Sequence, residues 1–401
     1  MCPIQVTTIR GRGRAYCATA SIAKGETVLT SSPIAAIVSQ EWLPETCLWC
    51  FYCSYPRRNK VRAIAHQDIK RRKTPFEGAG FCSDSCKELA VTSNYAGEWE
   101  IVQKAYLALD HEYRAREQHE GIATPAASEV DVEDYFGGHV DADISETEEA
   151  TDINDSVKLK EYIDRVWNLA TRDSALLANT ESFVPESERV DMCKLIATCL
   201  IRNYYSENSI SDPSIQNFDS LMHMQYNEVT RFQDLYRKME VAGSTMTIPA
   251  TALQSFEEAS KYVPEDIMQD IQLYLFFSAA FEKKDIDIPW AFNHTLFRHV
   301  LYREMSNSFG IWDPSEGSDQ ELLGWALHPK AVYFNHSCEP NIRKVRQGRN
   351  MVFIAEQNIE QGDELCIAYG SVAEPVDERR NRLFDNYSFW CQCSRCTRES
   401  A

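Results

Sequence analysis

Three cysteines, Cys391, Cys393 and Cys396, lie within six consecutive positions of the 401-residue chain. Thiolates at this spacing are typical zinc ligands, and a structural zinc ion takes four ligands at the corners of a tetrahedron. The segment therefore needs a fourth ligand from elsewhere. Cys338, in YFNHSCEPNI, is the candidate, and it would tie the three cysteines back onto that segment.

The remaining cysteines also favour metal binding. Most of the 14 cysteines cluster as C-x2-C, C-x3-C and C-x-C-x2-C. The N-terminal MCPIQVTTIRGRGRAY lacks the apolar region of a secretory signal, and no run reaches the roughly 18 apolar residues of a membrane span. Clustered thiols in such a chain favour zinc over the alternative, disulfides. We therefore expect a nuclear or cytoplasmic protein without membrane association.

The formal net charge of −19 argues against nonspecific nucleic-acid binding and favours basic partners. Ten acidic residues lie between Glu129 and Asp152, with no Lys or Arg among them. This composition predicts a solvated, disordered insert at residues 129–156. A docking surface for a basic peptide is the alternative.

Short strands are predicted at both ends of the chain, with helices between them. Alternating apolar residues predict two strands in residues 17–38, joined by a turn at residues 23–26. Short apolar runs after Asn307, with a turn at residues 347–350, predict further strands. Helical periodicity marks residues 157–170, 189–205 and 265–281. A β-rich fold is therefore split by a long helical insertion.

Three motifs in this order resemble the SET-domain lysine methyltransferases with a post-SET zinc site. They are NHSCEPN (335–341), GDELCIAYG (362–370) and CQCSRC (391–396). The resemblance implies that Cys338, Cys391, Cys393 and Cys396 hold one zinc ion.

Further segments resemble the SMYD-type branch, whose SET domain is split by a MYND zinc finger. CLWC (47–50) and FCSDSC (81–86) resemble half of such a finger, and RGRGRAY (10–16) and NSFGIWD (307–313) also match the branch. A full MYND finger binds two zinc ions, whereas only one set is found here: Cys47, Cys50, Cys82 and Cys86. The chain has no counterpart of the family's C-terminal helical-repeat domain, which makes it similar to shorter fungal-type SET proteins.

The resemblance implies an α+β fold, in which a β-rich SET fold with a pseudoknot is split by the finger and the helical insertion and closed by the post-SET zinc. The implied segments are a SET N-terminal part (1–44), a partial MYND-like finger (45–90), a helical segment (91–128), the acidic insert (129–156), a helical insertion resembling I-SET (157–303), a SET C-terminal part (304–375) and the post-SET segment (376–401).

The resemblance also implies S-adenosylmethionine-dependent methylation of protein lysines, with histone tails as the expected substrate. The nucleophile of such a displacement is a neutral amine, although free lysine has a pKa of about 10.4. A narrow apolar channel and the adjacent sulfonium charge would both lower that pKa. Positioning and electrostatics then suffice, which agrees with the lack of an obvious Ser/His/Asp triad.

Motif position assigns the expected roles. Tyr369 would be the catalytic residue that orients the amine, although without its motif it would be interpreted as a core tyrosine. Phe309 and Tyr387 would line the substrate channel. The residues expected to bind the cofactor are Arg10, Gly11, Arg12, Gly13, Asn307, Asn335, His336, Tyr369 and Phe389.

Two other functions remain open. The SET fold could be a catalytically idle, zinc-stabilised interaction module whose finger and acidic insert recruit a basic or Pro-rich partner. Alternatively, the methylated substrate could be a protein of the translation machinery. In each case we expect a monomer that binds protein and makes no direct nucleic-acid contact.

Overall fold

The computed structural model describes residues 3–64, 74–120, 150–179, 182–208, 218–239, 246–282, 293–313 and 320–400. The chain divides into two compact units. Unit 1 comprises Met1–Leu107, Asp191–Tyr226 and Thr295–Ala401, and unit 2 comprises Ala108–Val190 and Asn227–His294. Residues 129–149, most of the predicted acidic insert, lie outside the described residues.

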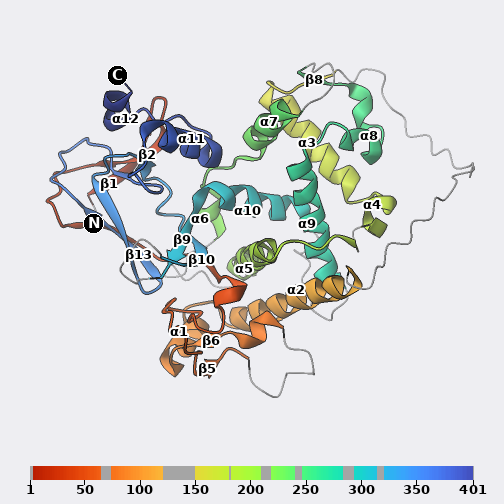
Figure 1. The fold of residues 1–401 in the computed structure, drawn as a ribbon, viewed down its shortest axis with the longest axis horizontal. Helices are drawn as coiled ribbons and strands as arrows, with labels where there is room; N and C mark the ends of the chain where they lie inside the picture. The colour runs from red at the N-terminus through yellow and green to blue at the C-terminus, as the bar shows by residue number, and fades with distance from the viewer. Residues whose placement is uncertain are drawn as a thin grey trace, which may run out of the picture. The chain divides into compact units, whose positions relative to one another are not determined.

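Unit 1 joins strands from the two ends of the chain. The sheets β12-β13-β3 and β4-β10-β9 each combine one early strand with two late ones, so the two ends of the colour scale meet in Figure 1. Their bounds are β3 (Thr27–Ser31), β4 (Ala35–Val38), β9 (Ser308–Trp312), β10 (Leu322–Leu327), β12 (Ile342–Gln347) and β13 (Asn350–Ala355). All pairs in both sheets are antiparallel. The mixed helix-and-sheet architecture is therefore confirmed.

The smaller sheets of unit 1 are two-stranded. β1 and β2 form an antiparallel hairpin, β5 pairs with β6 in the finger, and β11 pairs in parallel with β14. Their bounds are β1 (Ile4–Ile9), β2 (Gly13–Ala18), β5 (Val61–Arg62), β6 (Gly80–Phe81), β11 (Asn335–His336) and β14 (Cys366–Ile367).

The predicted turn at residues 23–26 is confirmed, but the strands beside it do not pair with each other. The Glu26 N–H donates to the Ala23 carbonyl (3.1 Å), and Gly25 has a φ of +89°. β3 pairs with β13 instead, and Ile22 forms an isolated bridge with Ile359. The early segment therefore pairs with strands from the end of the chain, and local sequence patterns do not predict these distant partners.

The helices of unit 1 include η1 (Gln40–Trp42), η3 (Pro75–Gly78), α1 (Asp84–Thr92), α6 (Phe218–Met222), α11 (Val376–Tyr387) and α12 (Ser394–Glu399). Three helices contribute residues to both units: α2 (Glu98–Glu120), α5 (Ser187–Asn208) and α10 (His294–Asn307). Unit 2 also contains β7 (Thr151–Asp152), α3 (Ser156–Ala170), α4 (Ser174–Asn179), α7 (Glu228–Lys238), β8 (Thr247–Ile248), η5 (Ala250–Leu253), α8 (Phe256–Ser260) and α9 (Glu265–Glu282).

The three helices predicted from periodicity are confirmed as α3, α5 and α9. α3 begins at Ser156 and is capped by Asp155, whose carboxylate accepts hydrogen bonds from the N–H groups of Val157 and Lys158. Its apolar stripe, which runs from Leu159 to Ala170, is buried. Among the described residues, no helix is both long and apolar enough to cross a bilayer.

The core of unit 1 lies under the predicted active-site tyrosine. Phe334 and Phe353 stack with ring centroids 4.4 Å apart, and Tyr16 packs on Phe334 at 4.9 Å. Tyr369 and Phe309 pack against the edge of this buried cluster. The core therefore supports the residues that are expected to do chemistry.

We expect Phe353→Ala to destabilise unit 1 by about 3–5 kcal/mol, because it removes a fully buried ring and leaves a cavity. Phe384→Ala is the matched control, since that ring is 49% exposed, and its cost should be about 1 kcal/mol or less. Urea unfolding followed by tryptophan fluorescence measures both. Equal shifts of the two midpoints would contradict the assigned core.

Candidate active site and zinc-binding clusters

Four cysteine sulfurs converge where α12 meets β11. The Sγ atoms of Cys338, Cys391, Cys393 and Cys396 all lie within 4.8 Å of one another, and those of Cys338 and Cys396 are 3.5 Å apart. A tetrahedral zinc ion with Zn–S bonds of about 2.3 Å requires sulfur–sulfur distances of about 3.8 Å. The four buried side chains therefore fit one zinc ion, and we call them the post-SET cluster.

Local structure places each cysteine of this cluster. Cys338 follows β11, whose parallel pairing with β14 fixes its direction. α11 ends at Tyr387, and its C-cap residue Ser388 lies in the left-handed region (φ +54°), which turns the chain toward Cys391. Cys393 is the N-cap residue of α12, and Cys396 lies in the first turn of that helix.

The charge of the cluster is balanced from α11. Burial raises the pKa of the Cys338 and Cys391 thiols, so a cation is needed to hold them as thiolates. Four thiolates around one Zn²⁺ would still leave an excess of negative charge. Arg379, whose side chain is 1% exposed, donates to Cys396 Sγ (3.6 Å) and to Glu399. Its guanidinium is thus a buried counter-charge for the cluster.

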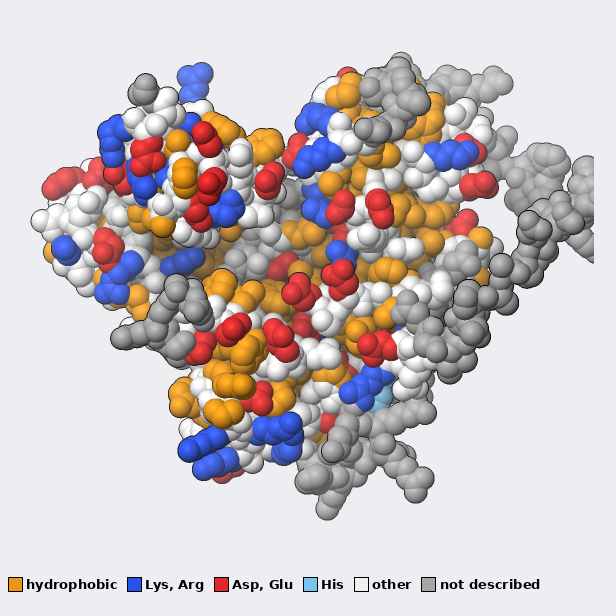
Figure 2. Space-filling model, viewed as in Figure 1, with side chains coloured by type: hydrophobic (Ala, Val, Ile, Leu, Met, Phe, Trp, Pro, Cys, Tyr) orange, Lys and Arg blue, Asp and Glu red, His pale blue; other side chains and the backbone are white. Residues whose placement is uncertain are grey.

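Other arginines brace the same segment. Arg380 donates to the Cys391 carbonyl (3.0 Å), and Arg395 donates to the carbonyls of Cys338 (3.5 Å) and Val372 (2.8 Å). Figure 2 shows basic and acidic side chains interspersed over α11 and α12. These contacts join both helices to the stretch that carries Cys338.

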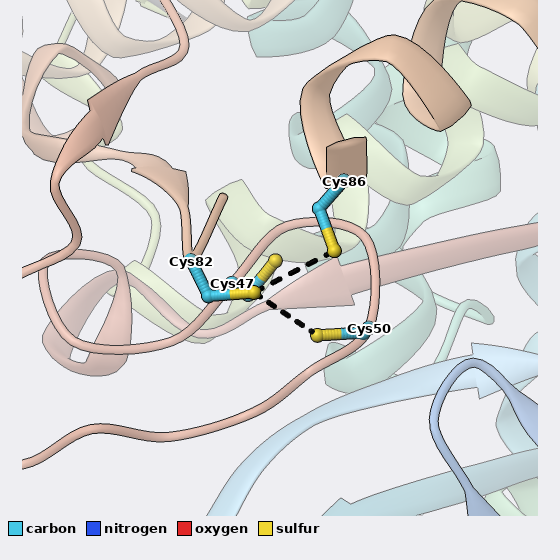
Figure 3. Close-up of side chains that lie close together, drawn as sticks. All are labelled: Cys47, Cys50, Cys82 and Cys86. Atoms are coloured by element: carbon cyan, nitrogen blue, oxygen red, sulfur yellow. Dashed lines mark hydrogen bonds between the residues drawn. The ribbon is translucent and has the colours of Figure 1, made fainter. Parts of the chain in front are cut away.

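A second cluster lies in the finger, where the sulfurs of Cys47, Cys50, Cys82 and Cys86 converge (Figure 3). Cys82 Sγ lies 3.7 Å from Cys50 Sγ and 3.5 Å from Cys86 Sγ, distances that also fit one zinc ion. Hydrogen bonds from Cys50 and from the backbone lower the pKa of Cys47, which favours a thiolate. We call this set the finger cluster.

Caps and turns shape the finger cluster. Ser83 is the N-cap of α1, and its hydroxyl accepts the N–H of Cys86 (3.2 Å), which places Cys86 in the first turn. Phe51 has a φ of +59° and donates its N–H to the Cys47 carbonyl (3.0 Å). Cys53 is not part of the set of four.

The tip of the β12–β13 hairpin contacts the finger. Arg346 donates to the Cys50 carbonyl (3.3 Å) and to the Trp312 carbonyl (3.0 Å). The guanidinium of Arg349 lies 4.5 Å from the ring centroid of Trp49 and 5.5 Å from that of Phe51. The finger loop is therefore attached to a SET strand pair.

Tyr369 lies among aromatic rings. Its centroid is 4.9 Å from Tyr387, 5.4 Å from His336 and 6.3 Å from Phe389. Its hydroxyl donates to the Phe334 carbonyl (3.0 Å). Burial, with a smaller contribution from Tyr387, raises the pKa of Tyr369, so the hydroxyl stays protonated at neutral pH.

His336 is buried with both ring nitrogens engaged. Nδ1 accepts the backbone N–H of Tyr369 (3.2 Å), and Nε2 lies 3.2 Å from Cys338 Sγ. Burial, together with nearby arginines such as Arg382, lowers the pKa of His336 to about 4. The ring is therefore neutral at pH 7.

A partly exposed ion pair connects the β1–β2 turn to this site. Arg12 Nε lies 2.8 Å from Glu364, and Arg12 Nη2 donates to the His336 carbonyl (3.2 Å). The amide of Asn335 donates to the same Glu364 carboxylate (2.8 Å). Sequence reasoning missed Glu364, although it lies in the GDELC motif as the acidic residue nearest to Cys366.

Gly11 and Gly13 take positive φ values of +76° and +73° in the turn.

The expected site residues are only partly brought together. Asn335, His336, Tyr369, Tyr387 and Phe389 lie in contact or share a partner, and Arg12 joins them through Glu364. Arg10 is exposed in the β1–β2 turn.

Two further expected residues face other groups. Asn307 donates its amide to the carbonyls of Gln225 (3.0 Å) and Arg303 (2.7 Å), where it closes the end of α10. Phe309 packs edge-on against His328 at 5.6 Å in the core.

A family model for the SET domain matches residues 13–370 of the chain. The chain belongs to the SET-domain family. Cys338 and the finger cluster lie within the matched residues, whereas Cys391, Cys393 and Cys396 of the post-SET cluster lie just beyond them. Both clusters fit the partial MYND-like finger and the post-SET site expected from the sequence.

Relatives of the SET domain differ in how much they match. A Saccharomyces cerevisiae protein described as potential protein lysine methyltransferase SET6 is 25% identical over 98% of this chain and 95% of its own length. A SET and MYND domain-containing protein of Dictyostelium discoideum is 38% identical, but over 26% of each chain. Human histone-lysine N-methyltransferase SMYD3 is 38% identical over 27% of this chain and 24% of its own length. The matches to these two proteins thus span about a quarter of each.

Elemental analysis should find two zinc ions per chain and one in Cys391→Ser, because each cluster offers four sulfurs for one ion. Cys53→Ser is the control and should retain two, since Cys53 is outside the finger set. A loss of zinc from Cys53→Ser would show that the finger set is wrong.

We expect Arg379→Gln to release zinc from the post-SET cluster about 10-fold faster to a chelator, because the buried counter-charge is lost. Arg398→Gln is the control, since the Arg398–Glu339 pair is exposed and should contribute little. A colorimetric chelator measures both rates. Equal rates of zinc release for the two variants would contradict the role of Arg379 as a counter-charge.

Proposed function

We propose that this SET domain is a protein-lysine N-methyltransferase with S-adenosylmethionine as methyl donor. The family match and the yeast relative, which aligns over nearly the whole chain, support this activity. The observation that carries the proposal is the grouping of Tyr369 with Tyr387 and Phe389 beside the post-SET cluster.

The aromatic rings around Tyr369 suit a lysine channel. Bound S-adenosylmethionine would supply an electrophilic methyl group. The rings of Tyr369, Tyr387 and Phe389 would exclude water from the amine and so favour its neutral, nucleophilic form. The Tyr369 hydroxyl and the Phe334 carbonyl, 3.0 Å apart, offer oxygens that can orient the amine hydrogens.

We assign cofactor contacts to the residues around β11 and the β1–β2 turn. Asn335, His336 and Phe389 would border the adenosyl part. Arg10 is exposed in the turn, which suits contact with a carboxylate, while Gly11, Arg12 and Gly13 would shape the backbone there. Asn307 and Phe309 remain proposed as outer contacts, although both pack into neighbouring structure.

The substrate would be a lysine-containing protein, and histone tails are the first candidate. The net charge of −19 suits a basic peptide, and one of the similar human proteins is described as a histone-lysine N-methyltransferase. We further propose that the protein acts as a monomer in the nucleus or cytoplasm.

Tyr369→Phe should reduce methyl transfer about 100-fold or more, because the variant loses the oxygen that orients the amine. Its affinity for S-adenosylmethionine, measured by calorimetry, should stay within about twofold of the original. Transfer of tritiated methyl to histones and to a whole-cell protein extract gives the rate. Tyr55→Phe is the matched control, because that side chain is 70% exposed in the finger.

Two results would count against the proposal. Wild-type transfer by Tyr369→Phe would contradict the role of the hydroxyl. No heat with S-adenosylmethionine at high micromolar concentration would favour the idle interaction module. Labelling confined to non-histone proteins of the extract would keep the activity and overturn the histone assignment.

A further inference from the structure

His336 joins the post-SET cluster to the backbone of Tyr369. One ring nitrogen contacts a zinc-ligand candidate, Cys338, and the other contacts the amide of Tyr369, both at 3.2 Å. The ring is 3% exposed, and its position is also fixed through the main chain. The Arg12 guanidinium donates to the His336 carbonyl, and β11 pairs with β14.

The direction of the two hydrogen bonds follows from their partners. A backbone N–H only donates, so Nδ1 of His336 must accept from Tyr369 and carries no proton. In the neutral ring the proton is then on Nε2, which donates to Cys338 Sγ. A thiolate bound to zinc is a good acceptor for such a donor, and outer hydrogen bonds of this kind tune metal sites.

We propose that His336 is a positioning residue that couples zinc in the post-SET cluster to the orientation of Tyr369. Zinc would fix Cys338, Cys338 accepts from Nε2 and so orients the ring, and Nδ1 accepts the backbone N–H of Tyr369, whose hydroxyl donates to the Phe334 carbonyl. The effect of His336 on Tyr369, the catalytic part of this role, rests on the proposed function. Its effect on zinc in the post-SET cluster, the metal part, does not depend on that function.

This role differs from a contact to the cofactor. The side-chain nitrogens of His336 are both used inside the protein, so its ring can border the cofactor pocket only through its face and edge. The ring centroid is 6.1 Å from Phe389, which agrees with a wall of that pocket.

Two substitutions separate the two hydrogen bonds. In His336→Asn, the amide oxygen can replace Nδ1 and accept from Tyr369, but the side chain is too short to reach Cys338. In His336→Gln, the amide nitrogen can replace Nε2 and donate to Cys338, while the acceptor near the Tyr369 amide is lost. Neither change introduces a charge.

The experiment compares zinc release and catalysis in the full chain loaded with zinc. Zinc release is followed with the chelator 4-(2-pyridylazo)resorcinol, and the post-SET phase is identified as the one missing from Cys391→Ser. His336→Asn should release this zinc about 10-fold faster or more and keep kcat within a few-fold of the original while zinc is bound. His336→Gln should release zinc at the original rate and lose about 10-fold or more in kcat, with a smaller change in KM.

Controls distinguish this role from a loss of packing. The finger phase of zinc release should be unchanged in both variants. His328→Gln, at another buried histidine of unit 1, should leave both phases unchanged. Circular dichroism confirms that each variant is folded.

The outcomes separate the two proposals. Zinc release at the original rate in His336→Asn, or equal acceleration in Asn and Gln variants, would overturn the metal part. An unchanged kcat in His336→Gln would overturn the link to Tyr369. If the unaltered protein transfers no methyl group, the proposed function and the catalytic part fail, while the zinc-release comparison still decides the metal part.

Discussion

The site depends on one closure, in which Cys338 meets sulfurs from the C-terminal segment. Cys338 and Cys396 are 58 positions apart in the chain, and their sulfurs lie 3.5 Å apart. This closure brings Tyr387, the last residue of α11, and Phe389, which follows that helix, against Tyr369. Without a cation, four thiolates at this distance would repel one another, and their burial would be unfavourable.

The closure could be predicted from sequence because the cysteine spacing is typical of zinc ligands and the short motifs resemble those of a known family. The eight cysteines of the two clusters, and the strands and helices with clear periodicity, follow from local patterns. The partner of β3 does not, because an early strand can pair with any late strand of matching register. Glu364 was missed for a similar reason. Glu364 forms an isolated bridge with Cys17, and its carboxylate has no distinctive signal until Arg12 and Asn335 are brought to it.

For Asn307, its position in a motif is a poorer guide to its role than the contacts of its side chain. Its motif, NSFGIWD, places it near the predicted site, but its amide closes the last turn of α10 on the Arg303 carbonyl. A polar side chain at a helix end satisfies backbone groups before it is available to a ligand. The same argument applies to His336, whose ring nitrogens are engaged by groups that no sequence pattern connects.

The contact between the finger and the β12–β13 hairpin affects how the protein can be divided. Arg349 lies over Trp49 and Phe51, and Arg346 bonds to the carbonyl of Cys50, so the finger loop covers part of a SET strand pair. Excising residues 45–90 to obtain a minimal catalytic fragment would remove the carbonyl partner of Arg346 and the aromatic partners of Arg349. A shortened version would therefore lose contacts that hold the hairpin tip in place, and the finger is better regarded as an integral wall than as a detachable module.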